Sequence, residues 1–311
     1  MNRISNLRKA QLKQNIPFYW MLLPGFIATF IFNYLPIFGI VIAFKRFSPA
    51  QGIFGSPWAG FDNFKYLFRN AETWTVLRNT IGYNIIFIGL GMVMNVCLAI
   101  LLSQVAGKLA KKVYQTILIM PHFLSMVIVA YIVYAFLSPE NGFLNTAILG
   151  PLGIDPINWY VNPKPWPYIL SIVHFWKVCG WGSVMYLAAI AGIDTSLYEA
   201  AEIDGANRWQ KIWYITLPSI KTIIIIKLIM DVGKIFNSDF GLFYQVPMNS
   251  GALYPVTNTM DLFVYNTMGQ GGIAGTGMSA ATSLFKSVVG FCLVMITNSI
   301  VRKVDNDNAM F

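Results

Sequence analysis

Charged side chains interrupt one of the most apolar stretches of the chain, and their spacing places them on one helix face. Lys227, Asp231, Lys234 and Ser238 follow one another at intervals of 4, 3 and 4 residues, which fits the repeat of an α-helix. A charge within a membrane span costs roughly 2.5–3.5 kcal/mol, so such residues usually face a cavity or a partner. This stripe therefore suits either a path for a polar solute or an internal ion pair.

A second stripe has the same helical spacing and consists of His174, Lys177 and Trp181. Binding sites for small polar molecules combine aromatic walls with a few hydrogen-bonding groups, and this combination suits a sugar. The candidate residues for a substrate pathway are His174, Trp176, Lys177, Trp181, Asp231, Lys234, Asn237 and Lys286. The alternative is that these charges pair structurally, and both readings stay open at this point. The basic residues make an acidic, uronate-containing oligosaccharide conceivable as the substrate.

The composition is that of a membrane protein. The chain has 311 residues, of which 56% are hydrophobic and only 11% charged, with a net charge of +9. Because soluble domains carry roughly 25% charged residues, these values argue against a soluble, disordered or nucleic-acid-binding chain. The three cysteines and two histidines have no disulfide or metal-ligand spacing, so we expect no metal site.

The elements that must position the candidate residues are six apolar runs. They lie at about residues 16–44, 76–104, 114–137, 167–193, 219–246 and 279–301. Each is long enough for a transmembrane helix, which needs about 20 residues. The first run follows a basic segment, residues 1–15, and is too long for the core of a signal peptide. We predict an all-α, polytopic membrane protein with six transmembrane helices.

Two connecting segments are expected outside the membrane. Residues 151–167 are rich in Pro, Asn and Trp, which is typical of an interfacial loop with Trp159, Tyr160 and Trp166 as belt aromatics. The glycine-rich stretch 269–277 is expected to be a flexible loop on the outer side.

The distribution of Lys and Arg predicts the orientation. Twelve of them lie in the N-terminal segment, the loops after the second and fourth runs, the start of the fifth run (Lys221) and the tail 302–311, whereas five lie in the loops on the other side. Since basic residues are retained on the cytoplasmic side, both termini are expected there. We expect a multi-pass protein of the bacterial cytoplasmic membrane.

The segment between the fourth and fifth runs, Asp194 to Pro218, is polar and predicts two short helices on the cytoplasmic side. Ser196 and Glu199 have the S-x-x-E pattern of a capping box, and Gly205 suits a helix end. Asn207 can cap the second helix. A helix with small side chains can enter a cleft on a partner. The alternative is an amphipathic helix lying on lipid, although anionic lipid would repel its acidic residues.

This segment resembles the EAA loop of binding-protein-dependent ABC importers. Glu199-Ala200-Ala201, Gly205 and the ending Ile215-Thr216-Leu217-Pro218 match the pattern E-A-A, three residues, G, and a later I-x-L-P. The resemblance covers nearly the whole chain. Phe32–Pro36 and Gly60–Phe64 look like sugar permeases of the maltose type. Trp176–Ile193 and Phe285–Gly290 look like the branch that serves complex oligosaccharides and polysaccharide fragments.

In that family the EAA loop is a coupling helix that docks on a cytoplasmic ATPase. The resemblance implies that the coupling residues are Glu199, Ala200, Ala201, Asp204, Gly205, Ala206, Leu217 and Pro218. It also implies the partners of the chain, which are a second homologous permease, two cytoplasmic ABC ATPase subunits, an extracellular solute-binding protein and a carbohydrate substrate. Transport would proceed by alternating access within the lipid bilayer.

The sequence lacks the phosphate-binding pattern G-x-x-x-x-G-K-[ST]. We therefore expect no catalytic residue and no cofactor on this chain, with ATP and Mg bound by the partner ATPase subunits. The leading alternative is a secondary transporter driven by protons or sodium, in which Asp231 would act as a relay. A membrane-embedded enzyme is a third class, but His122 and His174 lie on separate runs and outside any catalytic motif.

Overall fold

The computed structural model describes residues 2–270 and 272–304, with side chains for residues 15–269, 272 and 275–303. The expected tail beyond residue 304 lies outside the described residues. The described residues contain helices and a single isolated bridge, between Lys45 and Trp58. Three helical stretches are long and apolar enough to cross a membrane, Asn15–Phe44, Ala71–Ser103 and Gly275–Lys303, and two bent helix pairs raise the number to five. The prediction of an all-helical, multi-pass membrane protein is therefore confirmed.

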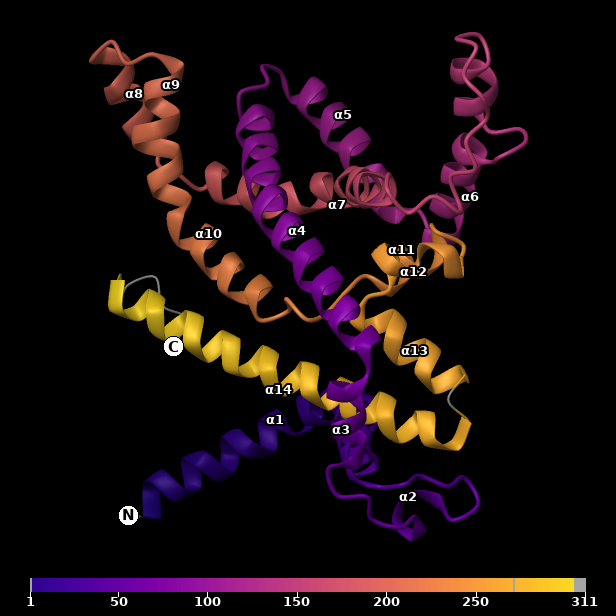
Figure 1. Cartoon of the computed structure of the whole chain (residues 1–311). Helices are drawn as coiled ribbons and strands as arrows, with labels where there is room; N and C mark the ends of the chain where they lie inside the picture. Colours follow the sequence, from indigo (N-terminus) through magenta and orange to yellow (C-terminus); the bar gives the residue numbers. More distant parts are fainter. Residues whose placement is uncertain (1, 271, 305–311) are drawn as a thin grey trace. The chain divides into compact units, whose positions relative to one another are not determined.

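The chain forms two compact units (Figure 1). The first contains residues up to 67 together with 267–284, and the second contains residues 68–266 together with those from 285 onward.

In the first unit, one long helical stretch leads into a tight turn. It consists of α1 (Asn2–Thr29), the π-helical η1 (Phe30–Tyr34) and the 3₁₀-helical η2 (Leu35–Phe44), followed by α2 (Gly52–Gly55). The next helix is α3 (Asp62–Arg69), and Asn63 at its start is buried. Its amide donates to the carbonyl oxygens of Ala43 (2.8 Å) and Lys45 (3.0 Å). Asn63, which belongs to the Gly60–Phe64 motif, thereby satisfies two backbone carbonyl groups where η2 ends.

The glycine-rich stretch 269–277 is helical rather than a flexible loop. α13 (Met260–Gln270) and α14 (Gly272–Val304) occupy it, and residue 271 lies outside the described residues. A Cβ atom on Gly275 would lie 2.1 Å from the carbonyl oxygen of Thr267, and one on Gly277 would lie 2.9 Å from that of Lys45. These two glycines permit close backbone contact, which a glycine-rich composition alone does not distinguish from flexibility.

The second unit is built around α4 (Ala71–Ser103) and α7 (Trp166–Ala191), which pack against each other. Buried residues of both helices form two apolar clusters. One includes Tyr83, Leu170 and Phe243, and the other includes Val96, Tyr186 and Ile220. α10 (Leu217–Val232) contacts both long helices and completes the second cluster.

The third apolar run is not one straight span. It forms α5 (Lys108–Ile119), the 3₁₀-helical η3 (Met120–Phe123) and α6 (Met126–Leu137), and the two arms are bent by 95°. Pro121 lacks the N–H that would continue the helix, and Ser125 caps α6 through the amide of Ile128. Hydropathy predicted the apolar length correctly but is insensitive to such a break.

The fifth apolar run is interrupted in the same way. α10 ends at Val232, and α11 (Phe240–Gln245) starts only after an irregular linker, residues 233–239. The amide of Asn84 on α4 donates to the carbonyl oxygens of Ile235 (2.9 Å) and Asn237 (2.8 Å) in this linker. Carbonyl groups that leave a helix need other donors, and Asn84 supplies them for two residues of the linker.

Three further side chains of α4 donate hydrogen bonds to the backbone of a second segment, which lies between α11 and α13. The segment contains the 3₁₀-helical η6 (Gly251–Leu253) and α12 (Tyr254–Thr257). Asn79 donates to the carbonyl oxygens of Pro255 and Asn258 (both 3.1 Å), Tyr83 donates to that of Val256 (3.0 Å), and Arg78 donates to that of Pro255 (2.9 Å).

The expected interfacial aromatics are part of the core instead. Trp166 is fully buried and Tyr160 nearly so, within the first apolar cluster. The preceding loop includes the π-helical η4 (Leu144–Leu149), and buried Asn145 cross-links it. The Oδ1 atom of Asn145 accepts from Trp159 (3.1 Å), and its amide donates to Ile157 (2.9 Å). The prediction of membrane-belt side chains was therefore wrong for Tyr160 and Trp166, because the loop folds back onto the helices.

Candidate functional site

The polar segment 194–218 begins with a sharp change of direction. α7 ends at Ala191, and α8 (Thr195–Ile203) follows at an angle of 70°. The first residue of the segment, Asp194, caps α8 by accepting from the amide of Ser196 at 3.0 Å. The predicted capping box at Ser196 and Glu199 was wrong by two residues. Ser196 holds the pKa of Asp194 below its ordinary value, so the cap is charged at neutral pH and is lost only as the pH falls through that lowered pKa.

α8 ends in a glycine cap at the predicted residue. Gly205 has a φ of +74°, in the left-handed region that glycine adopts without strain. The amide of Gly205 donates to the carbonyl of Glu202 (3.1 Å), and that of Ala206 donates to the carbonyl of Ala201 (2.8 Å). This pair of bonds is the Schellman motif, which satisfies the last carbonyl groups of a helix and turns the chain sharply.

The second helix continues without interruption into the long helix α10. It starts as α9 (Arg208–Lys211), with a capping box between Asn207 and Gln210, passes through the π-helical η5 (Ile212–Thr216) and becomes α10. Two contacts brace α8 against this helix. Lys211 pairs with Glu202 at 3.2 Å, and the hydroxyl groups of Tyr198 and Thr216 are 2.9 Å apart. These two contacts connect α8 to the helix that continues into α10.

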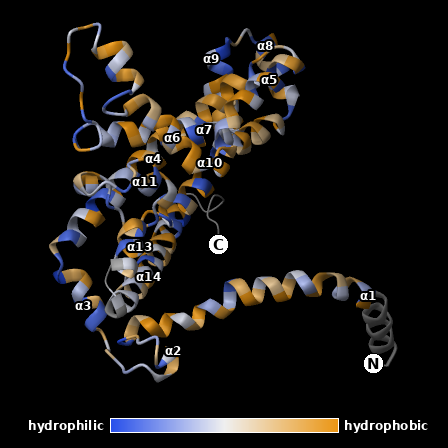
Figure 2. Cartoon of the chain, turned by 90° about the vertical axis from the view of Figure 1, so that its right-hand side faces the viewer, coloured by the Kyte–Doolittle hydropathy of each residue, from blue (hydrophilic) through white to orange (hydrophobic). Residues whose placement is uncertain are grey.

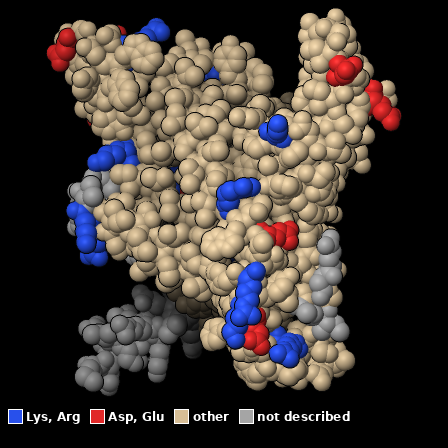
Figure 3. All heavy atoms as spheres, in the orientation of Figure 1, with Lys and Arg blue, Asp and Glu red and all other residues tan. Residues whose placement is uncertain are grey.

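α8 and α9 lie together at the N-terminal end of α10 (Figure 1). Several hydrophilic residues mark them in Figure 2, whereas the described part of α1 is mainly hydrophobic. Figure 3 shows acidic and basic side chains close together at this end. Glu199, Ala200, Asp204 and Gly205 are exposed to solvent.

The predicted coupling residues separate into two groups. Ala201, Asp204, Gly205 and Ala206 line a hollow of about 270 Å³ between α8 and η5. Leu217 packs against the second apolar cluster and Pro218 lies in the first turn of α10, where proline is favoured. The motif therefore joins an exposed turn to the base of a long helix.

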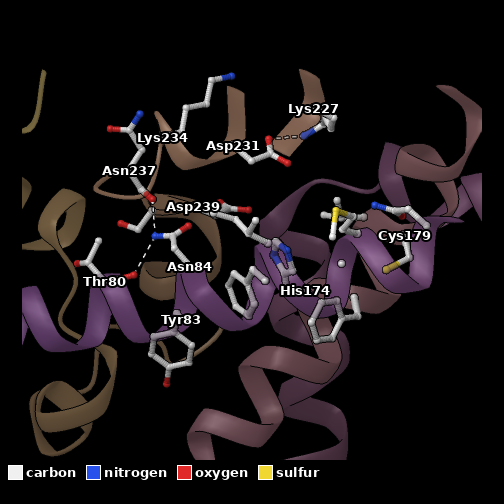
Figure 4. A pocket seen from close by; sticks show the side chains of 18 of the residues that line it. Thr80, Tyr83, Asn84, His174, Cys179, Lys227, Asp231, Lys234, Asn237 and Asp239 are labelled. Carbon is white, nitrogen blue, oxygen red and sulfur yellow. Dashed lines mark hydrogen bonds and ion pairs between the residues drawn. The ribbon is translucent and has the colours of Figure 1, made fainter. Parts of the chain in front are cut away.

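The second candidate site is a polar pocket of about 300 Å³ inside the second unit (Figure 4). Its walls come from α4, α7, α10, the linker 233–239 and α11. Of the eight predicted pathway residues, the pocket brings together His174, Asp231, Lys234 and Asn237. The pocket thus places residues of α10 and the linker beside His174 of α7, which no spacing rule connects, and whether they contact a substrate stays a prediction.

The charges of the pocket are partly neutralised. Asp231 forms an ion pair with Lys227, one helical turn away, and Figure 4 draws this pair at the edge of the pocket. Lys234 is exposed and makes no ion pair within the described part of the chain. The ring of His174 stacks on Phe87 with 3.7 Å between centroids and an interplanar angle of 5°. The pocket thus offers an aromatic wall, an amide, a carboxylate and a cation to a polar ligand.

The other four predicted pathway residues lie outside this pocket. Lys177 is buried and donates to the carbonyl oxygens of Pro121, His122 and Leu124, at the break between α5 and α6. Lys286 pairs with Asp261, which also accepts from the amide and hydroxyl of Ser238. Trp181 stacks on His122 with 4.8 Å between centroids, and Trp176 is exposed.

Replacing Lys177 by methionine is expected to destabilise the second unit. The change leaves three carbonyl groups of the break without their charged donor, and a hydrogen bond to a charged group is worth about 1.5–3 kcal/mol. We expect less folded protein in the membrane, with substrate affinity unchanged in the fraction that folds. Thermal unfolding and a substrate titration measure the two effects, and Lys177→Arg is the control that keeps the donor. Weaker substrate affinity without any loss of stability would instead place Lys177 in the pathway.

Sequence reasoning missed the structural roles of Asn79, Tyr83 and Asp261. Each bonds to a backbone carbonyl group or a charged side chain more than 20 residues away. The only sequence signal for Asn79 and Tyr83 is a polar group within an apolar run, and Asp261 lies outside the six predicted runs. Among the described residues, no three His, Cys, Asp or Glu side chains come close enough together to hold a metal ion.

Comparisons with known proteins point in one direction. Residues 87–306 match the family described as "Binding-protein-dependent transport system inner membrane component". The polygalacturonan/rhamnogalacturonan transport system permease protein YteP of Bacillus subtilis (strain 168) is 36% identical over 288 residues, which are 92% of this chain and 87% of that protein.

Two solved structures share the fold. A bacterial ABC transporter involved in the import of the acidic polysaccharide alginate matches with a TM-score of 0.84 and 33% identity, over 96% of this chain and 99% of that one. The alginate transporter in complex with an alginate pentasaccharide-bound periplasmic protein matches with a TM-score of 0.82 and 32% identity, over 95% and 97% of the two chains.

Proposed function

The chain belongs to the family of binding-protein-dependent transport system inner membrane components, and we propose that it forms one half of a translocation pathway. It is a permease subunit of an ABC importer for sugars or oligosaccharides. It is a transport component and not itself an enzyme. The observation that carries the proposal is the braced helix–turn–helix at 194–218, which lies within the residues that match the family. The ion-coupled secondary transporter is not supported, since the relatives are ABC importer permeases.

The arrangement in the membrane follows from the helices and the basic residues. We propose six spans, counting the bent pair α5–α6 as the third and α10 with its linker and α11 as the fifth. Both termini and the segment 194–218 then lie on the cytoplasmic side of a bacterial cytoplasmic membrane. Twelve of the Lys and Arg residues counted above fall on that side.

The segment 194–218 acts as the coupling segment in this proposal. Its exposed turn, with Glu199, Ala200 and Gly205, docks on a cytoplasmic ATPase subunit. ATP and Mg are bound by two such partner subunits, and closure of the ATPase pair moves α8. The Glu202–Lys211 and Tyr198–Thr216 contacts carry this movement into α10, which forms one wall of the polar pocket.

The remaining partners complete the transport cycle. A second, homologous permease forms the other half of the pathway, and an extracellular solute-binding protein delivers the substrate. A binding protein is part of one matched complex, as the alginate transporter was solved with its periplasmic protein. We propose a uronate-containing oligosaccharide as the substrate. The names of two relatives describe transport of acidic polysaccharides, which supports this proposal. Lys234 also supports it, because this exposed cation has no ion-pair partner among the described residues.

Affinity purification of the chain in mild detergent tests the assembly. The proposal expects a second permease and an ATPase to co-purify, and expects ATP hydrolysis that rises when loaded binding protein is added. Uptake that is competed by oligogalacturonates but not by neutral oligosaccharides of equal length supports the acidic substrate. Purification of the chain without any ATPase would contradict the assembly.

Asp231→Ala is expected to lower uptake by about tenfold, because Lys227 loses its partner at a partly exposed site. The cost should lie between that of an exposed pair and that of a buried pair, at about 1–2 kcal/mol. Asp231→Glu keeps the charge and should be milder. The double variant Lys227→Ala/Asp231→Ala separates the two roles that the sequence left open. It recovers uptake if the pair is purely structural, and it stays impaired if Asp231 contacts the substrate. Initial uptake rates, normalised to the amount of complex in the membrane, are the measurement.

A further inference from the structure

A third cavity of the second unit has no role in the proposed import function. It is a groove of about 820 Å³ between the C-terminal half of α4 and the helix that starts with α9. Apart from Met92, it shares no lining residue with the polar pocket. Its walls are almost entirely apolar and include Val93, Ile100 and Leu101 from one helix and Ile212 and Trp213 from the other.

The groove is open rather than filled by side chains of the described residues. Leu101 is 65% exposed, Trp213 is 64% exposed and Trp209, which also lines it, is 72% exposed. One wall is α4, which is long and apolar enough to span a membrane. Because large exposed apolar surfaces mark interaction sites, an apolar ligand is expected here.

Two polar side chains give the groove its chemical specificity. Arg208 is the only charged residue among those that line it, and Gln104 is the only side-chain amide. Neither side chain makes a hydrogen bond or an ion pair within the described part of the chain. A guanidinium group presents a planar set of donors that matches a phosphate, and tryptophan side chains favour the headgroup level of a bilayer.

We propose that this groove binds one anionic glycerophospholipid. The phosphate is held by Arg208 and Gln104 beside Trp209, and the acyl chains lie along α4 and η5. The single uncompensated cation selects an anionic lipid over a zwitterionic one. An apolar helix of a partner protein would fill the apolar walls but would supply no counter-charge to Arg208. Since Arg208 is three residues after Gly205, the lipid also fixes the coupling segment at the membrane surface.

Native mass spectrometry of the intact transport complex tests the site. Phosphatidylglycerol is added to the delipidated complex, with phosphatidylcholine as the zwitterionic comparison. We expect phosphatidylglycerol to remain bound to the wild-type complex, and Arg208→Gln to weaken its binding by about tenfold through the loss of a charge-assisted contact. Arg302→Gln removes an exposed arginine outside the groove and should leave binding unchanged.

A groove-filling variant keeps the test independent of charge. Val93→Trp occupies the apolar wall and should displace the lipid while Arg208 is intact, whereas Ile86→Trp, on the same helix but outside the groove, should not. Equal binding of phosphatidylcholine and phosphatidylglycerol would overturn the proposal. Unchanged phosphatidylglycerol binding in Arg208→Gln would also overturn it. Efficient cross-linking of Cys97, which lines the groove, to another protein chain of the complex would overturn it as well. These readouts measure bound lipid and do not depend on transport.

Discussion

Replacing Gly205 by valine is expected to abolish most uptake while leaving the permease in the membrane. A β-branched residue disfavours the left-handed conformation at φ +74°, at a cost of about 1–2 kcal/mol, so the Schellman turn after α8 is lost. No atom lies within 4 Å of the added Cβ position, so the change causes no clash in the core. We expect uptake at least about tenfold lower, with ATP hydrolysis persisting but no longer stimulated by loaded binding protein.

Two variants control this result. Gly153 also has a positive φ, of +70°, and open space around it, but lies in the loop after η4, so Gly153→Val should keep uptake. Gly205→Asn should be milder than Gly205→Val, because asparagine tolerates the left-handed region. If Gly205→Val and Gly153→Val behaved alike, the turn after α8 would have no special role in coupling.

Replacing Gly180 by alanine is expected to prevent stable folding of the second unit. A Cβ atom at this position of α7 would lie 1.8 Å from the carbonyl oxygen of Leu118, which is a backbone atom of α5. The end of α5 must therefore move, and with it the break that Lys177 holds. Overpacking of this kind costs about 1–3 kcal/mol, and occasionally more when the backbone must shift. We expect loss of most folded protein, measured by thermal unfolding and by the amount of complex recovered in detergent.

Gly89→Ala is the matched control for Gly180→Ala. Gly89 lies within α4, and no atom lies within 4 Å of the position that its Cβ would occupy. Alanine should stabilise that helix by roughly 0.5–1 kcal/mol. Normal recovery of Gly180→Ala would show that the close contact between α5 and α7 is not required for folding.

The apolar runs predicted the long helices well because burial in a bilayer needs only length and hydropathy. α4 and α7 lie almost where expected. The interruptions at 120–125 and 233–239 could not be placed, because Lys177 and Asn84, which satisfy the exposed carbonyl groups there, lie about 50 and 150 residues away in sequence. Pro121 and Gly233 were the only local signals, and both residues also occur within uninterrupted spans.

The coupling segment could be predicted in detail because its structure is local. A helix, a glycine turn and an asparagine cap are each encoded within a few residues, and only the first cap was misplaced, by two positions. Lys177 and Lys286 show the opposite case. Lys177 was recognised in a helical stripe and Lys286 as a candidate pathway residue. Their partners, the carbonyl groups at 121–124 and Asp261, depend on tertiary contacts that spacing does not reveal.

Uptake into proteoliposomes tests most directly the claim that ATP hydrolysis on partner subunits drives this permease through residues 194–218. Vesicles contain either this chain alone or the complete complex, and labelled oligosaccharide is supplied with its binding protein. We predict uptake only with the complete complex and ATP, and none after deletion of residues 195–217. Uptake by the chain alone along a proton or sodium gradient, or undiminished uptake after the deletion, would contradict the account.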